Sequence, residues 1–383
     1  MTYDAIIVGA RVAGSATGML LARQGRSVLI VDRAEFPSDT WSTHFITMAG
    51  TELLKRWGAL EPLQALGVPV FDTIMVNTPD GNSLSVKDLF GPNDVCSPRR
   101  TDLDSTLSQL ARESGAEVRL GVTVTDVMRE ADGRVTGVKL RDAEGNASEE
   151  SAAIVIGADG RTSTVAKAVR PAERDRHKMH GAAVFAYFDN LDCPNEETCL
   201  KDGTFMFIFP TKERAACVGA AFNVKYEEET KADPEAMFWK YMALQPGWEE
   251  RIKAATRDGR WRLGELRDGY FRHAGGDGWA LVGDAACLKD PLPGHGITDS
   301  FLGAELLSRA IDEGFRSGDM PAAMARYDDA LWRLLRPVYE LTVSAATYDK
   351  TGDEIFGDIA GIATHIGAEK EELLAGGPFL DAP

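Results

Sequence analysis

Residues 5–32 read AIIVGARVAGSATGMLLARQGRSVLIVD, and this stretch decides the fold. Its first residues, 5–8, form a short apolar run of the kind that becomes a buried parallel strand. Residues 9–14 form a glycine-containing turn, and residues 15–23 predict a helix. A second apolar run over residues 27–31 predicts the next strand. The stretch therefore predicts a complete strand–turn–helix–strand unit within about 30 residues.

The turn carries part of a dinucleotide-binding fingerprint, G-x-G-x-x-G. Gly9 and Gly14 supply the first and third glycines, while Arg11 stands at the middle position. Because a middle glycine lets a pyrophosphate approach the backbone, we expect the Arg11 side chain to point away from that path or to contact phosphate itself. Asp32 ends the second strand, where a carboxylate accepts hydrogen bonds from ribose hydroxyls. On this motif alone, an ordinary β-α-β unit without a nucleotide remains an alternative.

Two further segments end predicted buried strands in the same way. Residues 153–156 lead into Gly157-Ala158-Asp159-Gly160, and residues 279–282 lead into Gly283-Asp284. The second segment continues through a proline-containing loop to Gly294-His295-Gly296-Ile297 and a predicted helix. Ligands of open α/β sheets bind at the carboxyl ends of the strands, so Asp284 is placed to hold a polyol hydroxyl. The start of the helix would stabilise negative charge on a bound group.

These three segments, in this order and spacing, resemble the FAD-binding elements of the class A flavoprotein monooxygenase superfamily. That superfamily also includes geranylgeranyl reductase-like enzymes and flavin-dependent halogenases. The resemblance covers residues 3–345 and implies an α/β fold. The implied architecture is a Rossmann-type, glutathione reductase-like FAD-binding domain with an inserted β-sheet-rich substrate domain and C-terminal helices. The implied boundaries are 1–70, 98–180 and 268–345 for the FAD-binding domain, 71–97 and 181–267 for the substrate domain, and 346–383 for a C-terminal helical segment and tail.

The resemblance also implies which residues contact FAD. The first turn and Asp32 would hold the ADP half, Asp159 and Gly160 would lie near the pyrophosphate, and the loop after Asp284 would face the isoalloxazine. Arg100-Thr101-Asp102-Leu103-Asp104 resembles the family's R-x-x-L-D helix start, with a solvated helix-cap cation as the alternative role of Arg100. The full set of predicted cofactor-binding residues is Gly9, Arg11, Val12, Ala13, Gly14, Asp32, Arg33, Thr43, His44, Arg100, Asp159, Gly160, Gly283, Asp284, Pro291, Gly294, His295, Gly296 and Ile297.

Several residues depart from the family pattern. Cys287 stands where monooxygenases often have histidine, and Thr298 replaces the usual asparagine after the G-x-G turn. Ala166 replaces the usual arginine of the second motif, with Lys167 beside it. These departures, together with Arg11, bear on the placement within the superfamily and not on the expected fold.

The expected substrate pocket lies between the β-rich block and the flavin. Phe205, Phe207 and Phe209 alternate along one predicted strand, so they share one face. They form either an apolar pocket wall or a packed sheet core. His44 and His295 are the histidines near the inferred flavin positions, and each is a candidate acid or base with a structural role as its alternative.

The leading functional hypothesis is an FAD-dependent monooxygenase. By the resemblance, NADH or NADPH would reduce the flavin, and molecular oxygen would then hydroxylate or epoxidise an apolar or aromatic small molecule through a flavin hydroperoxide. The sequence has no second complete fingerprint, so the nicotinamide donor is expected to bind transiently. A geranylgeranyl reductase-like enzyme acting on a C=C bond and a non-catalytic flavin-binding redox partner are the alternatives. Trp261-Arg262-Leu263 does not match the tryptophan-pair motif of halogenases, which disfavours halogenation.

Composition narrows the possible partners and location. The 383 residues carry 42 basic and 59 acidic side chains, a net charge of -17, which disfavours nucleic acid and anionic membranes as partners. Five scattered cysteines without C-x-x-C spacing indicate neither a metal site nor a disulfide framework. No apolar run reaches the roughly 18 residues that span a bilayer. A cytoplasmic location is the default expectation, and the oligomeric state is not predicted.

Overall fold

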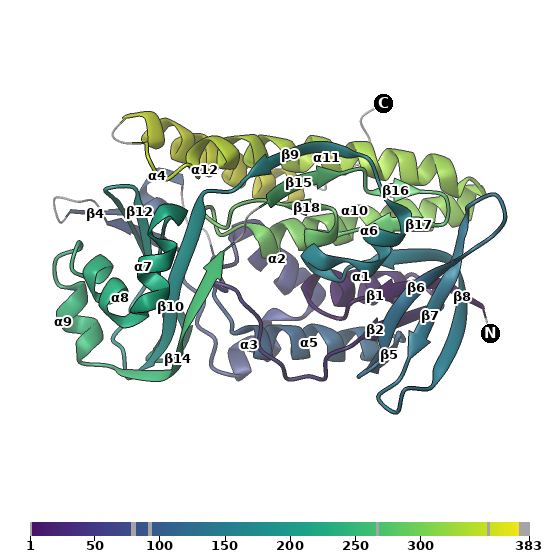
Figure 1. The fold of residues 1–383 in the computed structure, drawn as a ribbon, viewed down its shortest axis with the longest axis horizontal. Helices are drawn as coiled ribbons and strands as arrows, with labels where there is room; N and C mark the ends of the chain where they lie inside the picture. The colour runs from purple at the N-terminus through teal and green to yellow at the C-terminus, as the bar shows by residue number, and fades with distance from the viewer. Residues whose placement is uncertain (1, 78–81, 91–93, 266–267, 351–352, 375–383) are drawn as a thin grey trace.

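The structure is a computed structural model that describes residues 2–77, 82–90, 94–265, 268–350 and 353–374. Two large sheets lie side by side, and long helices run along one edge of both (Figure 1). The N-terminal strand belongs to one sheet, and strands from the middle of the chain make most of the other.

The first sheet is mostly parallel. Its strand order is β16-β17-β8-β1-β2-β5, with β7 also paired to β8 and β6 to β7. The central strand β1 pairs in parallel with β2 on one side and with β8 on the other. Its strands are β1 (Thr2–Val8), β2 (Val28–Asp32), β5 (Glu117–Leu120), β6 (Thr123–Arg129), β7 (Val135–Arg141), β8 (Ala147–Gly157), β16 (Gly275–Gly276) and β17 (Trp279–Leu281).

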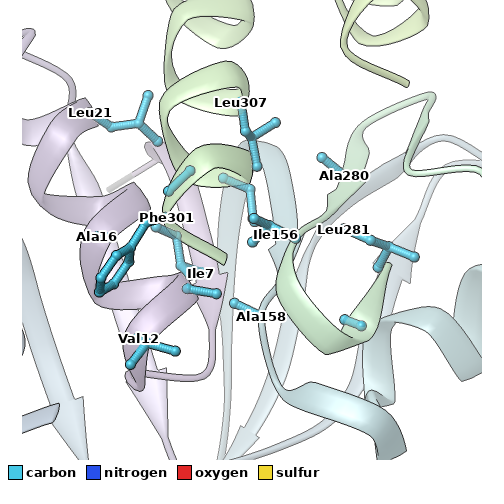
Figure 2. Close-up of a cluster of buried hydrophobic side chains, with 14 of the residues drawn as sticks. Ile7, Val12, Ala16, Leu21, Ile156, Ala158, Ala280, Leu281, Phe301 and Leu307 are labelled. Atoms are coloured by element: carbon cyan, nitrogen blue, oxygen red, sulfur yellow. The ribbon is translucent and has the colours of Figure 1, made fainter. Parts of the chain in front are cut away.

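Two helices cover the strands next to β1. Figure 2 shows apolar side chains of α1 (Val12–Arg23) and α10 (Gly296–Ser317) meeting those of β1, β8 and β17. Phe301 is fully buried there, close to Ile7 and Ala16 (Figure 2). Both helices are buried on most of their surface, and their apolar side chains form the main hydrophobic core together with the sheet.

The second sheet is largely antiparallel and has the order β14-β10-β13-β12-β11-β3-β4. Strand β3 pairs in parallel with β11, which joins residues 74–77 to a segment more than a hundred residues later. Apolar side chains on one face pack against α8 and α9. The elements of this part are β3 (Ile74–Asn77), β4 (Ser83–Ser85), β10 (Gly181–Asp189), β11 (Glu196–Lys201), β12 (Thr204–Lys212), β13 (Ala215–Asn223), β14 (Thr256–Glu265), α7 (Glu227–Ala232), α8 (Pro234–Met242) and α9 (Trp248–Lys253).

The remaining elements link and cover the two sheets. Helix α12 follows α11 and extends over the second sheet, at the top of the view in Figure 1. A small sheet has the order β18-β15-β9. These elements are α2 (Met48–Trp57), α3 (Leu60–Ala65), α4 (Val86–Phe90), α5 (Arg100–Glu113), α6 (Thr164–Val169), α11 (Met320–Ala345), α12 (Asp353–Leu374), β9 (Glu173–Lys178), β15 (Asp268–Arg272), β18 (Cys287–Leu288) and the 3₁₀ turns η1 (Gly160–Thr162), η2 (Val224–Tyr226) and η3 (Gly283–Ala285).

The predicted fold class is confirmed, with two differences in detail. The sequence pattern over 117–128 predicts a strand of a meander, but the structure has two strands there, because Gly121 has a φ of 72° and turns the chain from β5 into β6. The pattern over 234–257 predicts a helix, but the structure has two helices, because Gly247 has a φ of 79°, and strand β14 begins at Thr256. The turn expected at Asp80-Gly81-Asn82 and the tail from Gly376 lie partly or wholly outside the described residues. The domain boundaries stay a prediction.

No helix within the described ranges is long and apolar enough to cross a membrane.

Replacing Phe301 by alanine tests the core between α1 and α10. We expect Phe301→Ala to lower the free energy of unfolding by about 3–5 kcal/mol, because the buried ring leaves a cavity. Leu84, which is 51% exposed, supplies the control, since Leu84→Ala should change stability by about 0.5 kcal/mol or less. Urea denaturation followed by circular dichroism measures both. Equal stability of the two variants would contradict this core assignment.

Candidate active site

Three turns meet at the carboxyl ends of β1, β8 and β17. A Cβ atom added to Gly9 would lie 2.4 Å from the carbonyl oxygen of Ala158, and one added to Gly14 would lie 1.8 Å from the carbonyl oxygen of Gly9. A Cβ on Gly283 would lie 2.9 Å from the Cβ of Ala13. Backbone therefore packs on backbone at this junction, and glycine is required there with or without a ligand.

Arg11 is held away from the first turn by a buried carboxylate. Its Nη1 donates to Asp104 Oδ2 at 2.7 Å and its Nη2 donates to Ser38 Oγ at 3.0 Å. The other oxygen of Asp104 accepts from Arg100 Nε at 3.0 Å. Asp104 is fully buried, so it bridges the two arginines between the first turn and α5. A direct contact of Arg11 or Arg100 with FAD stays a prediction.

Sequence reasoning missed this role of Asp104. The signal was present, because Arg100 and Asp104 have the i, i+4 spacing of a helical ion pair. The contact with Arg11, in contrast, joins residues 93 positions apart.

Asp32 fixes the backbone around the first turn. Its Oδ2 accepts from the N–H of Ala10 at 2.7 Å, and its Oδ1 accepts from the N–H of Ala34 at 2.8 Å. Arg33, next to it, is exposed. The predicted ribose contact of Asp32 would use the remaining acceptor capacity of the same carboxylate.

Two carboxylates line the space in front of the second and third turns. Asp159 Oδ2 accepts from the N–H of Thr164 at 2.6 Å, while its Oδ1 is buried and has no hydrogen-bond partner in the described part of the chain. Desolvation raises the pKa of Asp159 and also that of Asp284. The Asp284 side chain is nevertheless exposed to solvent, so it is accessible to a ligand.

The third segment ends at the N-terminus of α10. Gly294 has a φ of 62°, and a Cβ there would lie 2.8 Å from the Phe45 ring. Gly296 begins the 22-residue helix, and a Cβ there would meet no atom within 4 Å among the described residues. Pro291 is half-buried and Ile297 is buried. The open space at Gly296 and the helix N-terminus fit a group that carries negative charge. The unpaired Asp159 oxygen, in contrast, would accept a hydrogen bond from a donor such as a hydroxyl or an amide.

Gly296→Ala separates a ligand contact from a folding role. The added methyl group faces open space, so we expect the variant to be as stable as the wild type or more stable by about 0.4–1 kcal/mol. Its affinity for FAD should fall about tenfold or more, since a clash of about 1.4 kcal/mol has that effect. Gly357→Ala, also an open helical position, is the control. Thermal unfolding and fluorescence titration with FAD measure the two effects. Unchanged FAD affinity in Gly296→Ala would remove this loop from the binding site.

His295 belongs to a buried ion cluster. Its Nδ1 lies 2.7 Å from Asp299 Oδ1, and its Nε2 lies 2.8 Å from Glu369 Oε2 in α12. Burial lowers the pKa of His295, but Glu369 and Asp299 outweigh burial and raise it to about 9. Lys289 pairs with the other oxygen of Asp299. Burial raises the pKa of Asp299, but the charges of Lys289 and His295 outweigh burial and lower this pKa to about 2. Both ring nitrogens thus face carboxylates, which suits the structural alternative considered for His295.

His295→Gln should destabilise the protein in a pH-dependent way. The folded-state pKa of about 9 lies above the ordinary 6.5, so the stabilisation from charged His295 is complete below pH 6.5 and disappears as the pH rises through 9. At pH 6.5 we expect a loss of about 3–5 kcal/mol, because the variant removes the charged partner of buried Glu369 and leaves Asp299 with Lys289 alone. Denaturation of both proteins between pH 6 and 10 measures the difference. A difference that stays constant over this range would contradict a charged His295.

His44 is a neutral, strained residue next to the second sheet. Its φ of 73° is left-handed, which is rare outside glycine and marks a position fixed by its surroundings. Its Nε2 lies 2.7 Å from the Tyr187 hydroxyl. Burial, with the charges of Arg100 and Arg99, lowers the pKa of His44 well below its ordinary value. The adjacent Thr43 is half-buried. Their cofactor contacts and the acid–base role of His44 stay predictions.

The three predicted phenylalanines share one face of the second sheet. Phe207 and Phe209 are stacked with ring centroids 4.8 Å apart, and Phe209 stacks on Phe45 at 5.0 Å. Both are buried, whereas Phe205 is only partly buried. Phe185 and Phe207 also close over Gly219, where a Cβ would lie 2.5 Å and 2.7 Å from their side chains. The two buried phenylalanines therefore pack as a core, and their contact with a substrate stays a prediction.

The next part of the same face is lined by small residues. A cavity of about 10 Å³ lies there, between β10 with its neighbours and the loop that precedes α10. Trp41, Asp290, Pro291 and Tyr348 form its walls, and Ala183 is among the residues of its floor. Of these residues, sequence reasoning assigned only Pro291 to the site.

Helix α12 covers this region. Ile362 and Ile366 belong to a buried cluster with Ala183, Leu292 and Tyr348. Nothing in the local sequence identifies these contacts, because they join α12 to segments far away in the chain.

The departures from the family pattern also have structural explanations. Thr298 Oγ1 lies 2.9 Å from Thr47 Oγ1, so it links α10 to the start of α2. Cys287 is buried in β18, and burial raises the pKa of its thiol.

The fold and the three turns define a flavin-binding α/β protein of the class A flavoprotein superfamily. A family described as FAD binding domain matches residues 2–321, and the chain belongs to this family. It is 29% identical over 349 residues to digeranylgeranylglycerophospholipid reductase 2 of Methanopyrus kandleri, covering 86% of this chain and 82% of that protein.

Solved structures share the same fold. A flavin-dependent brominase superposes with a TM-score of 0.82 at 21% identity, covering 96% of this chain and 94% of that one. A probable FAD-dependent monooxygenase from Pseudomonas aeruginosa superposes with a TM-score of 0.77 at 19% identity, covering 94% of this chain and 99% of that one. The fold thus occurs in proteins described as reacting in different ways.

Proposed function

We propose that the protein is an NAD(P)H-dependent FAD monooxygenase that acts on a compact apolar or aromatic molecule. The observation that carries the proposal is the small cavity beside the Pro291 loop. Two aromatic side chains, Trp41 and Tyr348, and a floor of small residues bound it. The cavity has room only for a small polar group, so a compact ring that carries one such group suits it better than a long apolar chain does.

Bound FAD would supply the two-electron redox chemistry. The residues of the chain would bind the dinucleotide at the three turns and orient the substrate against the second sheet. The buried α12 residues Ile362 and Ile366 would keep water out of the cavity. The overall reaction would consume NAD(P)H, a proton, molecular oxygen and the substrate, and would yield NAD(P)⁺, water and a product with one added oxygen atom.

Reduction of a C=C bond is the second candidate. The sequence similarity to the Methanopyrus kandleri reductase favours it. The cavity is too small for a ring or for an isoprenoid chain, and a long chain would in addition need the space that α12 fills, so α12 would have to move. The likeness to the brominase supports the common fold alone, because the two chains are 21% identical.

Absorbance spectroscopy of the purified, FAD-loaded protein separates these reactions. We expect NADPH or NADH to bleach the flavin spectrum in the absence of oxygen. Admission of oxygen should restore it within seconds and release peroxide when no substrate is present. A monooxygenase should also oxidise NAD(P)H faster when a compact aromatic substrate is added, with incorporation of ¹⁸O from ¹⁸O₂ measured by mass spectrometry.

Other outcomes reject the proposal in defined ways. Bleaching followed by slow reoxidation, with hydrogenation of an alkene under nitrogen, would establish the reductase alternative. Failure of FAD to bind would reject both enzymes. A flavin that binds but that neither nicotinamide reduces would favour a redox-partner role.

A further inference from the structure

Asp290 is the buried carboxylate of the cavity wall. It directly precedes Pro291 and is 2% exposed. Its Oδ1 accepts a hydrogen bond from the Tyr348 hydroxyl at 2.8 Å and another from the N–H of Leu292 at 3.0 Å. Two donors therefore fix one oxygen of the carboxylate, and this also fixes the direction of the other oxygen.

The other oxygen, Oδ2, is buried and has no hydrogen-bond partner among the residues that the structure describes. It points at Gly181, where a Cβ would lie 2.4 Å from it. Burying a carboxylate oxygen without a donor costs free energy, so such an oxygen in a cavity wall indicates a missing partner.

A second polar atom of the cavity is also unsatisfied. The indole Nε1 of Trp41 is buried and finds no acceptor within the described ranges. Trp41 packs flat on Gly264, where a Cβ would overlap the indole at 1.9 Å. The cavity thus offers one acceptor and one donor between otherwise apolar walls.

The size of the cavity limits what enters it. A volume of about 10 Å³ holds a group no larger than one water molecule. A hydroxyl or amino group fits, whereas an aromatic ring must remain outside the cavity.

We propose that Asp290 determines specificity: its Oδ2 binds the hydroxyl or amino group of a compact aromatic substrate, and Tyr348 positions the carboxylate. This inference rests on the proposed function, because it names the class of substrate for the same site. Burial raises the pKa of Asp290 to about 6, so the carboxylate is ionised at pH 8 and only accepts hydrogen bonds there. A donor on the substrate is therefore the matching partner.

Two probes of the same shape test the proposal. 4-Methylphenol carries a hydroxyl donor, and 4-fluorotoluene has fluorine in its place. Calorimetric titration of the oxidised, FAD-loaded protein at pH 8 should show that the wild type prefers 4-methylphenol by about tenfold or more, as a hydrogen bond to a charged acceptor provides. Equal affinity for the two probes would overturn the proposal without any variant.

Asp290→Asn should abolish this preference. The donors Tyr348 and Leu292 would hold the amide oxygen at the Oδ1 position, so the amide NH₂ would replace the acceptor with a donor. Affinity for 4-fluorotoluene should stay the same, which also shows that the variant is folded. Asp349→Asn, at an exposed neighbouring aspartate, is the matched control and should keep the wild-type preference. A preference unchanged in Asp290→Asn would overturn the proposal.

Tyr348→Phe gives an independent readout. It keeps the Asp290 carboxylate but removes one of the two donors that orient it. We expect the preference for 4-methylphenol to shrink while remaining greater than in Asp290→Asn. A preference as large as in the wild type would reject the positioning role of Tyr348.

Failure of this inference is distinguishable from failure of the proposed function. An Asp290-dependent probe preference without oxygen transfer to any aromatic compound supports the binding site and rejects the monooxygenase. Oxygen transfer with a probe preference that is independent of Asp290 supports the monooxygenase and rejects this role of Asp290.

Discussion

The close packing of three strand-ending turns through their backbones is the constraint on which the rest of the site depends. Gly9, Gly14 and Gly283 have no side chains because carbonyl oxygens or a neighbouring Cβ occupy the space that a Cβ would need. The contact brings together segments from the beginning, middle and end of the chain. Once they touch, the turns that carry Asp159 and Asp284 pack together beside the start of α10, and no further adjustment of the fold is needed to collect them.

Much of the fold could be predicted from local sequence patterns, whereas contacts between residues far apart in the sequence could not. The first strand–turn–helix–strand unit could be read because its turn and apolar runs are contiguous. The alternation of Phe205, Phe207 and Phe209 correctly predicted a shared face. The breaks at Gly121 and Gly247 were missed because a turning glycine inside a periodic segment looks like an ordinary small residue. The predicted FAD contacts stay predictions, and the binding experiments test them.

The site residues that sequence reasoning missed are partners in long-range pairs. Arg11 replaces the middle glycine of the fingerprint, and the carboxylate of Asp104, 93 positions away, holds its guanidinium away from the turn. His295 was predicted to be an acid or base or else a structural residue, and the sequence did not show that Glu369 of α12 lies at its Nε2. Asp290 carried no signal of its own, because its partner Tyr348 lies 58 positions further along. A sequence motif contains one residue of each such pair, and only the fold shows which residue is its partner.

The position of Glu369 in the last described helix has a consequence for biosynthesis. A ribosome releases the three turns before it has made α12. Until residue 369 has left the exit tunnel, His295 lacks its Glu369 partner and the cavity stays open on the side that α12 covers. A truncated product that ends before α12 would leave its apolar cavity wall in contact with solvent.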